Sequence, residues 1–376
     1  MRALFITWAW DSHLQPMVPF AWALRAAGHE VLVASHPSFA KTITAAGLAA
    51  LPVGEDLDVR GLMREAHRQF SPDESAIRHS GERANAVAIQ STNAMAKDTF
   101  CFAQHWRPDV VVYEPMAYLG PWLAAELDVP ALRLLWAADY MASIADKLEA
   151  KGLGTRQELF GKQAFGDVTL DPCPPRLRTR DELVRRPMRY VAYNGPAVMP
   201  QWLTDPPARP RIVVTWGRSH HYLGWDDAFR APAVVRALAG RDVEVVVAVL
   251  DEQRERFGEL PGNVVHLGPV ALNLVTRDCA GIIHQGGAGA TMTAVSAGVP
   301  QLIIGSAADA IVNARLVEAA GAGRYEPPDL DDAGLTRVVN SFLDDLPDLQ
   351  AGAAELHREH RAMPSPVEVA AQLEPD

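Results

Sequence analysis

Short apolar runs alternate with longer amphipathic stretches along most of the chain. "ALFIT" (3–7) is followed by "PMVPFAWALRAAG" (16–28) and then by "HEVLVAS" (29–35). The two short runs predict buried strands. The stretch between them has apolar residues at helical spacing and Gly28 at its end, and therefore predicts a helix. A strand, a short crossover and a second strand form a βαβ unit, which is typical of a parallel sheet.

The same alternation recurs further along. Apolar runs predict strands within 108–115, 130–136, 212–217, 243–250, 263–268, 280–284 and 300–305. Residues 55–105 are polar with a helical pattern. Residues 137–185 are charged and irregular, and we predict a loop over "DPCPPRLRTRDELVRR" (171–186). The chain has no short-period repeat and no low-complexity tract.

A proline-rich passage at 193–211 interrupts the alternation and predicts a domain linker. We therefore expect an α/β protein with two doubly wound, Rossmann-like parallel-sheet domains, at 1–200 and 201–362. A last helix within 363–376 is expected to cross back to the first domain. Folds of this kind bind ligands beyond the carboxyl ends of their strands, and two such domains place them in the cleft between the halves. Site residues are thus expected directly after strands.

Composition narrows the classes of partner. The 376 residues suffice for about two domains, and 48% of them are apolar, as in packed globular proteins. A net charge of −11 argues against nucleic acid or an anionic membrane as the main partner. The three cysteines form no CxxC pair, and no apolar run approaches the roughly 18 residues of a spanning helix. We expect a cytoplasmic protein with reduced thiols.

The glycine cluster in "HQGGAGAT" (284–291) is the strongest candidate for a binding turn. Gly286, Gly287 and Gly289 lie between a predicted strand at 280–283 and a predicted helix at 291–297. Glycines let backbone amides approach a ligand, and a helix N-terminus attracts a phosphate or diphosphate. A tight structural turn is the alternative. A nicotinamide dinucleotide fits poorly, because the first strand is not followed by G-x-G-x-x-G.

Three segments together resemble a known family. They are "DSHLQPMVPFAWALRAAGHEVLVAS" (11–35), "RPDVVVYEPMAYLGPWLAAELDVP" (107–130) and "IIHQGGAGATMTAVSAGVPQLIIGSAADAIVNARLVEAAGAG" (282–323). The chain resembles the two-domain GT-B glycosyltransferases that use nucleotide sugars, in particular those that tailor bacterial antibiotics. The resemblance implies inverting transfer of a (deoxy)sugar from a dTDP- or UDP-sugar to a lipophilic, polyketide-like acceptor, with an acceptor oxygen as the nucleophile.

The resemblance also implies a donor site in the second half. The diphosphate would lie at the glycine turn, on His284, Gln285, Gly286, Gly287, Ala288, Gly289 and Thr291. The sugar would contact Asp309 and Asn313, which form an Asp-x-x-x-Asn segment. Arg218 and Ser219 follow the strand at 212–217, and an arginine fork at this place suits a diphosphate. The backbone of Val270 would read the base.

This chain departs from the family's pattern at the turn. Gln285 stands where the family has a second histidine, and Ala290 where it has a threonine. Glutamine donates hydrogen bonds but cannot become cationic, so diphosphate contact should weaken by about 1 kcal/mol. The family's Trp-Val-Pro stretch reads Pro269-Val270-Ala271 here. An aromatic shelf for the base is therefore missing.

His13 follows the first strand and is the candidate general base. A histidine titrates near neutral pH and can take a proton from an acceptor hydroxyl, whereas helix capping or packing is the structural alternative. The resemblance favours the base. Glu114, after the strand at 108–115, and Asp11 are rival partners that would orient it. The aromatic and apolar side chains of Trp8, Trp10, Trp136, Tyr140 and Met141 are the candidate acceptor wall.

Metal ligands are not expected. His220 and His221 are adjacent loop residues without a nearby cysteine, and the Asp-x-Asp strings at 56–58 and 329–331 do not follow clear apolar strands. A helix N-terminus would stabilise the leaving diphosphate instead, with no resident cofactor. A nucleotide-sugar 2-epimerase, a silent sugar-nucleotide-binding partner of another transferase, and attachment through carbon remain alternatives. A homodimer or an auxiliary protein also stays open.

Overall fold

The computed structural model describes residues 1–68, 76–142, 165–179, 183–225, 228–305 and 308–373. Packing divides the chain into two compact units. Unit 1 contains 1–174, 178–195 and 362–376, and unit 2 contains 175–177 and 196–361. Residues 175–177, which lie within the predicted N-terminal domain, therefore pack with unit 2. The last residues of the chain pack with unit 1. Each unit is built on one parallel sheet.

Unit 1 has a seven-stranded sheet in the order β3-β2-β1-β4-β5-β6-β7, and every neighbouring pair is parallel. The strands are β1 (Arg2–Ile6), β2 (Glu30–Ser35), β3 (Ala49–Pro52), β4 (Val110–Tyr113), β5 (Ala131–Leu134), β6 (Val168–Asp171) and β7 (Arg185–Pro187). The helices are α1 (Asp11–Leu14), α2 (Val18–Ala26), α3 (Ala40–Ala45), α4 (Val59–Arg68), α5 (Ala76–Trp106), α6 (Leu119–Leu127) and α16 (Pro366–Ala371), with 3-10 turns η1 (Gln15–Met17) and η2 (Pro37–Phe39).

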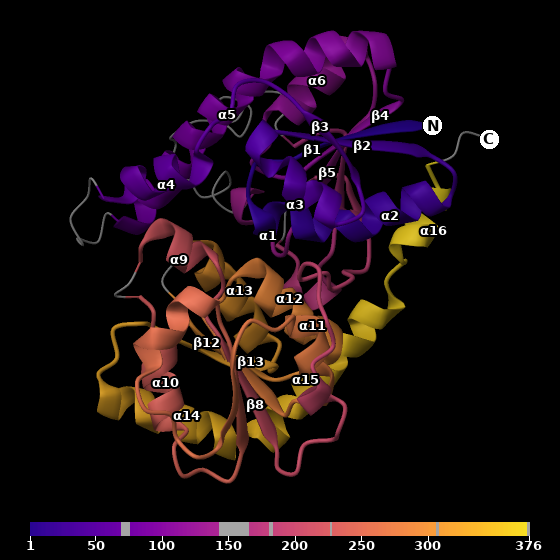
Figure 1. The fold of residues 1–376 in the computed structure, drawn as a ribbon. Helices are drawn as coiled ribbons and strands as arrows, with labels where there is room; N and C mark the ends of the chain where they lie inside the picture. Colours follow the sequence, from indigo (N-terminus) through magenta and orange to yellow (C-terminus); the bar gives the residue numbers. More distant parts are fainter. Residues whose placement is uncertain (69–75, 143–164, 180–182, 226–227, 306–307, 374–376) are drawn as a thin grey trace, which may run out of the picture. The chain divides into compact units, whose positions relative to one another are not determined.

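Helices cover both faces of this sheet, which explains why its strands are apolar on both sides. Leu4 and Ile6 of β1 pack in one cluster with residues of α5 and α6, whereas Phe5 contacts Phe20 of α2. Alternate residues of a strand point to opposite faces, so β1 needs apolar side chains at every position. Figure 1 shows α5 and α6 on one side of the strands and α2 and α3 on the other.

Unit 2 repeats this plan with six parallel strands in the order β10-β9-β8-β11-β12-β13. The strands are β8 (Arg211–Thr215), β9 (Glu244–Ala248), β10 (Val264–Gly268), β11 (Gly281–His284), β12 (Gln301–Ile304) and β13 (Gly323–Glu326). The helices are α9 (Ser219–Leu223), α10 (Ala231–Ala237), α11 (Leu272–Val275), α12 (Ala288–Ala297), α13 (Ala308–Ala319), α14 (Asp332–Asp344) and α15 (Leu346–Ala362). The 3-10 turns are η3 (Pro175–Leu177), η4 (Gln201–Leu203), η5 (Asp251–Phe257) and η6 (Thr276–Asp278).

The core of unit 2 also lies on both faces of its sheet. Ile212 and Val214 of β8 belong to a cluster with α10 and α14, whereas Val213 belongs to a cluster with α11 and α12. The expectation of two doubly wound parallel sheets is confirmed. In each sheet the order reverses between two central strands, β1 and β4 in unit 1 and β8 and β11 in unit 2. That switch point is where such folds bind ligands.

The C-terminal helix α16 packs against α2 of unit 1, as Figure 1 shows. Ser365 caps it: the Glu368 N–H donates to Ser365 Oγ, and the Ser365 N–H donates to Glu368 Oε2. This reciprocal capping box starts the helix, and Pro366 at its first position suits helix geometry. Val369 and Ala370 are fully buried.

Two predictions about local structure were wrong. The segment 171–186 is not only loop, because it begins with the last residue of β6 and ends with the first two residues of β7. Residues 143–164 and 180–182 of the region predicted to be irregular lie outside the described residues. Helix α12 begins at Ala288 rather than at 291, because Gly287 has an extended backbone and serves as its N-cap. Gly289 therefore lies in the first helical turn.

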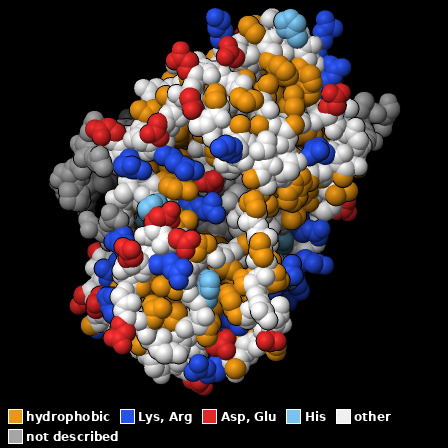
Figure 2. Space-filling model, in the orientation of Figure 1, with side chains coloured by type: hydrophobic (Ala, Val, Ile, Leu, Met, Phe, Trp, Pro, Cys, Tyr) orange, Lys and Arg blue, Asp and Glu red, His pale blue; other side chains and the backbone are white. Residues whose placement is uncertain are grey.

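Figure 2 shows that acidic and basic side chains are interspersed on the face it presents, over both parts of the chain. Mixed signs of this kind do not form the basic stripe that nucleic acids require. Within the described part of the chain, no helix has both the length and the apolar character needed to cross a membrane.

Candidate active site

The site in unit 1 lies at the switch point between β1 and β4. Ile6 of β1 is in register with Tyr113 of β4, so the residues after the two strands meet at the same edge of the sheet. The chain after β1 turns into α1, which carries His13. The chain after β4 continues at once into Glu114. Sheet register therefore brings together two residues that are far apart in sequence.

Glu114 is the carboxylate that faces His13. Its Oε2 lies 3.2 Å from His13 Nδ1, at ion-pair distance but without the alignment of a hydrogen bond. The Glu114 side chain is fully buried, and it accepts the N–H of Trp8 at Oε1 (3.2 Å) and the N–H of Met116 at Oε2 (2.8 Å). Two backbone donors thus hold this carboxylate in the orientation from which it contacts the imidazole.

Asp11, the rival partner, has a different role. Its Oδ2 lies 2.9 Å from Arg60 Nη2 on α4, and the residue begins α1, where a negative charge is favourable. The register of β1 with β4 brings the Glu114 carboxylate to His13.

Aromatic rings surround His13. The Trp136 ring centroid lies 4.1 Å from that of His13 with the planes tilted by 37°, and Trp8 meets His13 edge-on at 5.2 Å. Trp10 lies 6.1 Å from Trp8. Trp8 and Trp10 are buried, and Trp136 is partly exposed. Three of the five predicted acceptor-wall residues, Trp8, Trp10 and Trp136, therefore lie around His13.

Tyr140 and Met141 continue the same loop. They begin the helical residues 140–142 after β5, with Met141 buried and Tyr140 partly exposed. Both therefore share a short segment with Trp136.

The site in unit 2 lies at the second switch point, between β8 and β11. Thr215 of β8 is in register with His284 of β11. Gln285 follows His284 directly, and Gly217 lies two residues after Thr215. Gly217 has a φ of +64°, and a Cβ there would lie 2.5 Å from Gln285 Nε2. A Cβ at Gly287 would lie 2.9 Å from the same nitrogen. The Gln285 amide therefore occupies the space between these glycines.

Gln285 is buried with an unsatisfied oxygen. Its Oε1 has no hydrogen-bond partner among the described residues, and the same holds for the hydroxyl of buried Thr291. Unpaired buried polar atoms are uncommon and call for an explanation, such as a ligand or an ordered water. Both atoms belong to the strand-to-helix turn that was predicted to bind the diphosphate.

His284 has its ring nitrogens engaged inside the protein. The Gly286 N–H donates to Nδ1 at 3.0 Å, so the proton sits on Nε2, which donates to Gln301 Oε1 at 3.0 Å. Burial lowers its pKa to about 4, although the bond to Gln301 opposes the shift. His284 is therefore neutral at pH 7 and holds the turn, and both ring nitrogens of this predicted diphosphate residue are engaged by protein groups.

The glycine turn requires glycine at Gly286. Its φ is +89°, and a Cβ would lie 2.8 Å from Ala310 Cβ. Asn313 Nδ2 donates to the Gly286 carbonyl at 3.2 Å. Gly289 differs, because a Cβ there would have no heavy atom within 4 Å. No side chain caps α12, so its first amides, including that of Ala288, remain available.

The other predicted donor residues lie near the same edge or on the next helix. Arg218 is the N-cap of α9 and Ser219 its first residue, and two residues separate Arg218 from the end of β8. Val270 lies beyond β10 and packs partly against the α11–α12 cluster. Asp309 and Asn313 lie one turn apart on α13, hence on one face. Asn313 is buried and tied to the turn, whereas Asp309 is partly exposed.

The candidate metal residues serve as structural groups. Asp56 accepts the N–H of Ser38, Asp58 that of Gly61, and Asp331 that of Gly334 as the N-cap of α14. His220 is buried against Trp225, which lowers its pKa to about 4. No group of three or more metal-ligating side chains occurs in the described segments.

Comparison with known proteins identifies the family. Residues 22–217 match the erythromycin biosynthesis protein CIII-like N-terminal domain, and residues 232–375 match the corresponding C-terminal domain. The chain belongs to the erythromycin biosynthesis protein CIII-like family of glycosyltransferases. The resemblance drawn from the sequence is thereby confirmed.

Individual relatives of this EryCIII-like transferase match over nearly their whole length. The 10-deoxymethynolide desosaminyltransferase of Streptomyces venezuelae is 34% identical, over 100% of this chain and 96% of the relative. The structure of glycosyltransferase VinC in complex with dTDP has a TM-score of 0.82 at 31% identity, covering 99% of this chain and 98% of VinC. Spinosyn rhamnosyltransferase SpnG complexed with spinosyn aglycone has a TM-score of 0.80 at 30% identity, covering 100% of both chains.

Sequence reasoning missed some residues that shape the EryCIII-like site. Gly217 was not singled out, although a glycine directly after a buried strand is a signal for a close approach. Gln301, which fixes the tautomer of His284, gave no local signal because it lies on the next strand. The charged residues behind Trp136 were assigned to an irregular region.

Proposed function

We propose that this transferase moves a deoxysugar from a dTDP-sugar to a hydroxyl oxygen of a lipophilic, polyketide-like aglycone, with inversion at the anomeric carbon. The observation that carries the proposal is the His13–Glu114 pair at the switch point of unit 1, with Nδ1 and Oε2 3.2 Å apart. Nε2 of His13 is then the nitrogen left to receive the acceptor's proton. Relatives described as acting on 10-deoxymethynolide or as binding dTDP or spinosyn aglycone support the substrate classes.

The proposed roles are divided between the two units. In unit 1, His13 takes the proton as the acceptor oxygen attacks, and Glu114 orients the imidazole and stabilises its charged form. The rings of Trp8 and Trp136 provide apolar surface for the aglycone. In unit 2, the free amides at the start of α12 and the Gln285 side chain receive the diphosphate as it leaves. The proposal assigns no step to a metal.

The His13→Gln variant tests the base. Glutamine cannot take up a proton, so kcat should fall by roughly 10²- to 10⁴-fold, a typical general-base contribution. The affinity for dTDP, measured by calorimetry, should stay unchanged because the predicted donor residues belong to unit 2. Near-normal turnover in the variant would remove His13 as the base.

Product analysis tests the rest of the proposal. A dTDP-sugar panel is incubated with wild type, with and without an aglycone panel, and the anomeric configuration of the product is read by NMR. The proposal expects an inverted, oxygen-linked glycoside. A carbon-linked or retained product would contradict it, and conversion of the donor alone would indicate an epimerase. Donor binding without turnover across the panel would indicate a silent binding partner.

A further inference from the structure

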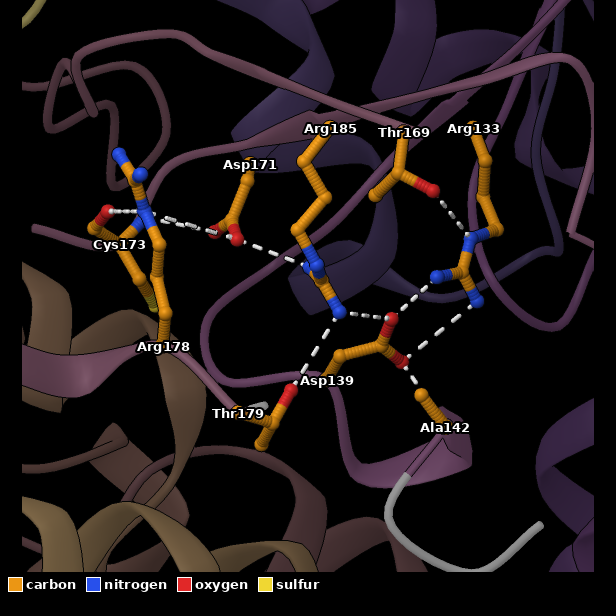
Figure 3. Close-up of polar contacts among 9 residues, drawn as sticks. All are labelled: Arg133, Asp139, Ala142, Thr169, Asp171, Cys173, Arg178, Thr179 and Arg185. Carbon is orange, nitrogen blue, oxygen red and sulfur yellow. Dashed lines mark hydrogen bonds and ion pairs between the residues drawn. The ribbon is translucent and has the colours of Figure 1, made fainter. Parts of the chain in front are cut away.

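A buried cluster of charged side chains in unit 1 connects β5, β6 and β7 to the loop that carries Trp136. Figure 3 shows its members: Arg133, Asp139, Asp171, Arg178 and Arg185, with the polar atoms of Thr169, Cys173, Thr179 and Ala142. Arg133, Asp139 and Asp171 are each at most 2% exposed. None of these residues is needed by the chemistry proposed above. Buried charges of this density are retained at a cost in desolvation, so a specific role is expected.

The strands carry these side chains in one row. Arg133 on β5 is in register with Thr169 on β6, which is in register with Arg185 on β7. Residues in register point to the same face of a sheet. Arg133 Nε donates to Thr169 Oγ1 at 3.3 Å, and the guanidinium lies 4.5 Å from the Phe165 ring centroid. The row therefore places the guanidinium groups of Arg133 and Arg185 on one face of the sheet.

Asp139 joins the row to the loop after β5. Its carboxylate accepts from both terminal nitrogens of Arg133 and from Arg185 Nη2 at 3.1 Å. Its Oδ1 also accepts the N–H of Ala142 at 3.1 Å, which caps the helical residues 140–142. The Arg133–Asp139 pair thus closes a loop of five residues, 134–138, and Trp136 stands at the middle of that loop.

Asp171 pairs with the other terminal nitrogen of Arg185. Its Oδ2 lies 2.8 Å from Arg185 Nη1, and its Oδ1 accepts the N–H of Cys173 at 2.9 Å. Burial raises the pKa of Asp171, and Arg185 opposes that shift. The Asp171 carboxylate contacts Cys173 and Arg178 in the segment after β6 and Arg185 on β7, none of which belongs to the loop that carries Trp136. Asp139 and Asp171 are therefore similarly buried, and both contact Arg185. They differ because Asp139 also contacts the segment after β5, whereas Asp171 contacts the segment after β6.

We propose that Asp139 is a positioning residue for the base: through the closed loop 134–138 it fixes Trp136 against the His13 ring. Trp136 lies 4.1 Å from His13 and Glu114 lies on its Nδ1 side, so the imidazole is held from two directions. Loss of either constraint lets the ring rotate away from the acceptor oxygen. The effect of Asp139 on catalysis rests on the proposed role of His13. The structural part of the inference, that Asp139 fixes Trp136, does not depend on that role.

Asp139→Asn is the first test, because asparagine keeps the size of the side chain and its cap on Ala142 but removes the charge. With the donor–acceptor pair that wild type turns over, kcat should fall by about 10- to 100-fold, as small misplacements of reacting groups do, with the donor KM unchanged. Asp171→Asn is the matched control and should leave kcat near wild type at a similar loss of stability. Equal effects of the two variants on kcat would overturn the proposal.

A double-mutant cycle with Trp136→Phe separates positioning from general destabilisation. If Asp139 acts through Trp136, the Asp139→Asn change should have little further effect on kcat once Trp136 is replaced. Additive losses would contradict the proposal. Arg133→Lys keeps the charge but loses the planar fork, so it should reproduce the effect in weaker form. Arg133→Lys also tests the proposal if the Asp139→Asn variant does not fold.

Hydrogen exchange gives a readout that needs no activity. Asp139→Asn should raise amide exchange in 135–142 and in the segment 8–14 that carries His13, whereas Asp171→Asn should raise it in 171–179. A uniform rise over unit 1 in both variants would reduce the cluster to a structural role. If wild type transfers no sugar, the proposed function fails, yet this exchange pattern still decides whether Asp139 fixes Trp136.

Discussion

Single residues show what the sequence could and could not predict about this site. His13 was singled out because it follows the first strand, and Gln285 because it departs from the family's pattern. The choice between Asp11 and Glu114 could not be made, because it depends on the register of β1 with β4. The role of His284 was missed for a similar reason, since Gln301 belongs to the neighbouring strand. Contacts across a sheet have no local signature.

Gln285→His should strengthen dTDP binding by about fivefold at pH 6, because an imidazolium adds a charge-assisted bond worth about 1 kcal/mol. The gain should fade as the pH rises and the ring loses its proton. Calorimetric titration of both proteins at pH 6 and pH 8 measures it. Equal affinities at pH 6 would show that the Gln285 side chain does not face the diphosphate, and Gln285→Ala provides the baseline.

His284 makes the stability of unit 2 sensitive to acid. Its folded pKa of about 4 lies below the usual value of 6.5, so the unfolded chain binds the proton more tightly. The stability it contributes is complete above about pH 6.5 and is lost as the pH falls toward 4, by at most about 1.4 kcal/mol per pH unit. His284→Asn should reduce this dependence of stability on pH. Urea unfolding at pH values from 7 to 4 measures the effect.

The exposed His221 provides the control for that measurement. His221→Asn also replaces a histidine, and because the side chain is exposed it should leave the stability at pH 7 near the wild-type value. Buried His220 also has a pKa of about 4, so it should keep part of the slope in the His284 variant. An identical slope in wild type and His284→Asn would contradict the assignment of a buried neutral imidazole.

At the scale of elements, apolarity decided which strands could be predicted. The central strands were found because both of their faces are covered by helices. The strands β6 and β7 were missed because Thr169, Asp171 and Arg185 make them look exposed. Their polar groups are satisfied by partners from other strands and loops, which a local pattern does not contain. The early start of α12 was missed because an extended glycine gives no capping signal.

The glycines of the turn before α12 should separate folding from binding. Gly286→Ala should destabilise unit 2 by about 2 kcal/mol or more, since its φ is +89° and a Cβ meets Ala310. Gly289→Ala should keep or raise stability, by up to about 1 kcal/mol, because a helical glycine with open space gains from a side chain.

The Gly289→Ala methyl nevertheless lies where the diphosphate is proposed to approach. Affinity for dTDP should therefore fall in this variant while urea unfolding shows an intact fold. Unchanged affinity would move the diphosphate away from the first turn of α12. The Gly286→Ala result tests the fold alone, since loss of the turn removes binding for an indirect reason.

At the scale of the molecule, the last helix is part of the first unit. Val369 on α16 is fully buried and Val367 is 63% exposed, so the pair offers a matched test. Val369→Asp should destabilise unit 1 by several kcal/mol, because it places an unpaired charge in an apolar contact. Val367→Asp should change stability by less than about 0.5 kcal/mol. Amide exchange in α2, residues 18–26, measures the effect.

A rise in α2 exchange with Val369→Asp and none with Val367→Asp is the expected result. Equal exchange in the two variants would mean that α16 does not support α2. The two-domain plan was visible in the sequence from its repeated strand and helix pattern and its proline-rich passage. The return of the C-terminus was only an expectation, because packing partners of a terminal helix cannot be read from its own residues.

The return of α16 to unit 1 constrains how halves of such enzymes can be recombined. A chimera joined once, within the proline-rich passage, takes its α16 from the parent that supplies unit 2. The α2 surface of the other parent then meets a helix that was selected against a different partner. Two junctions, one before residue 196 and one after α15, keep each packed unit from a single parent except for residues 175–177. The natural unit of exchange is therefore the internal segment and not the C-terminal half.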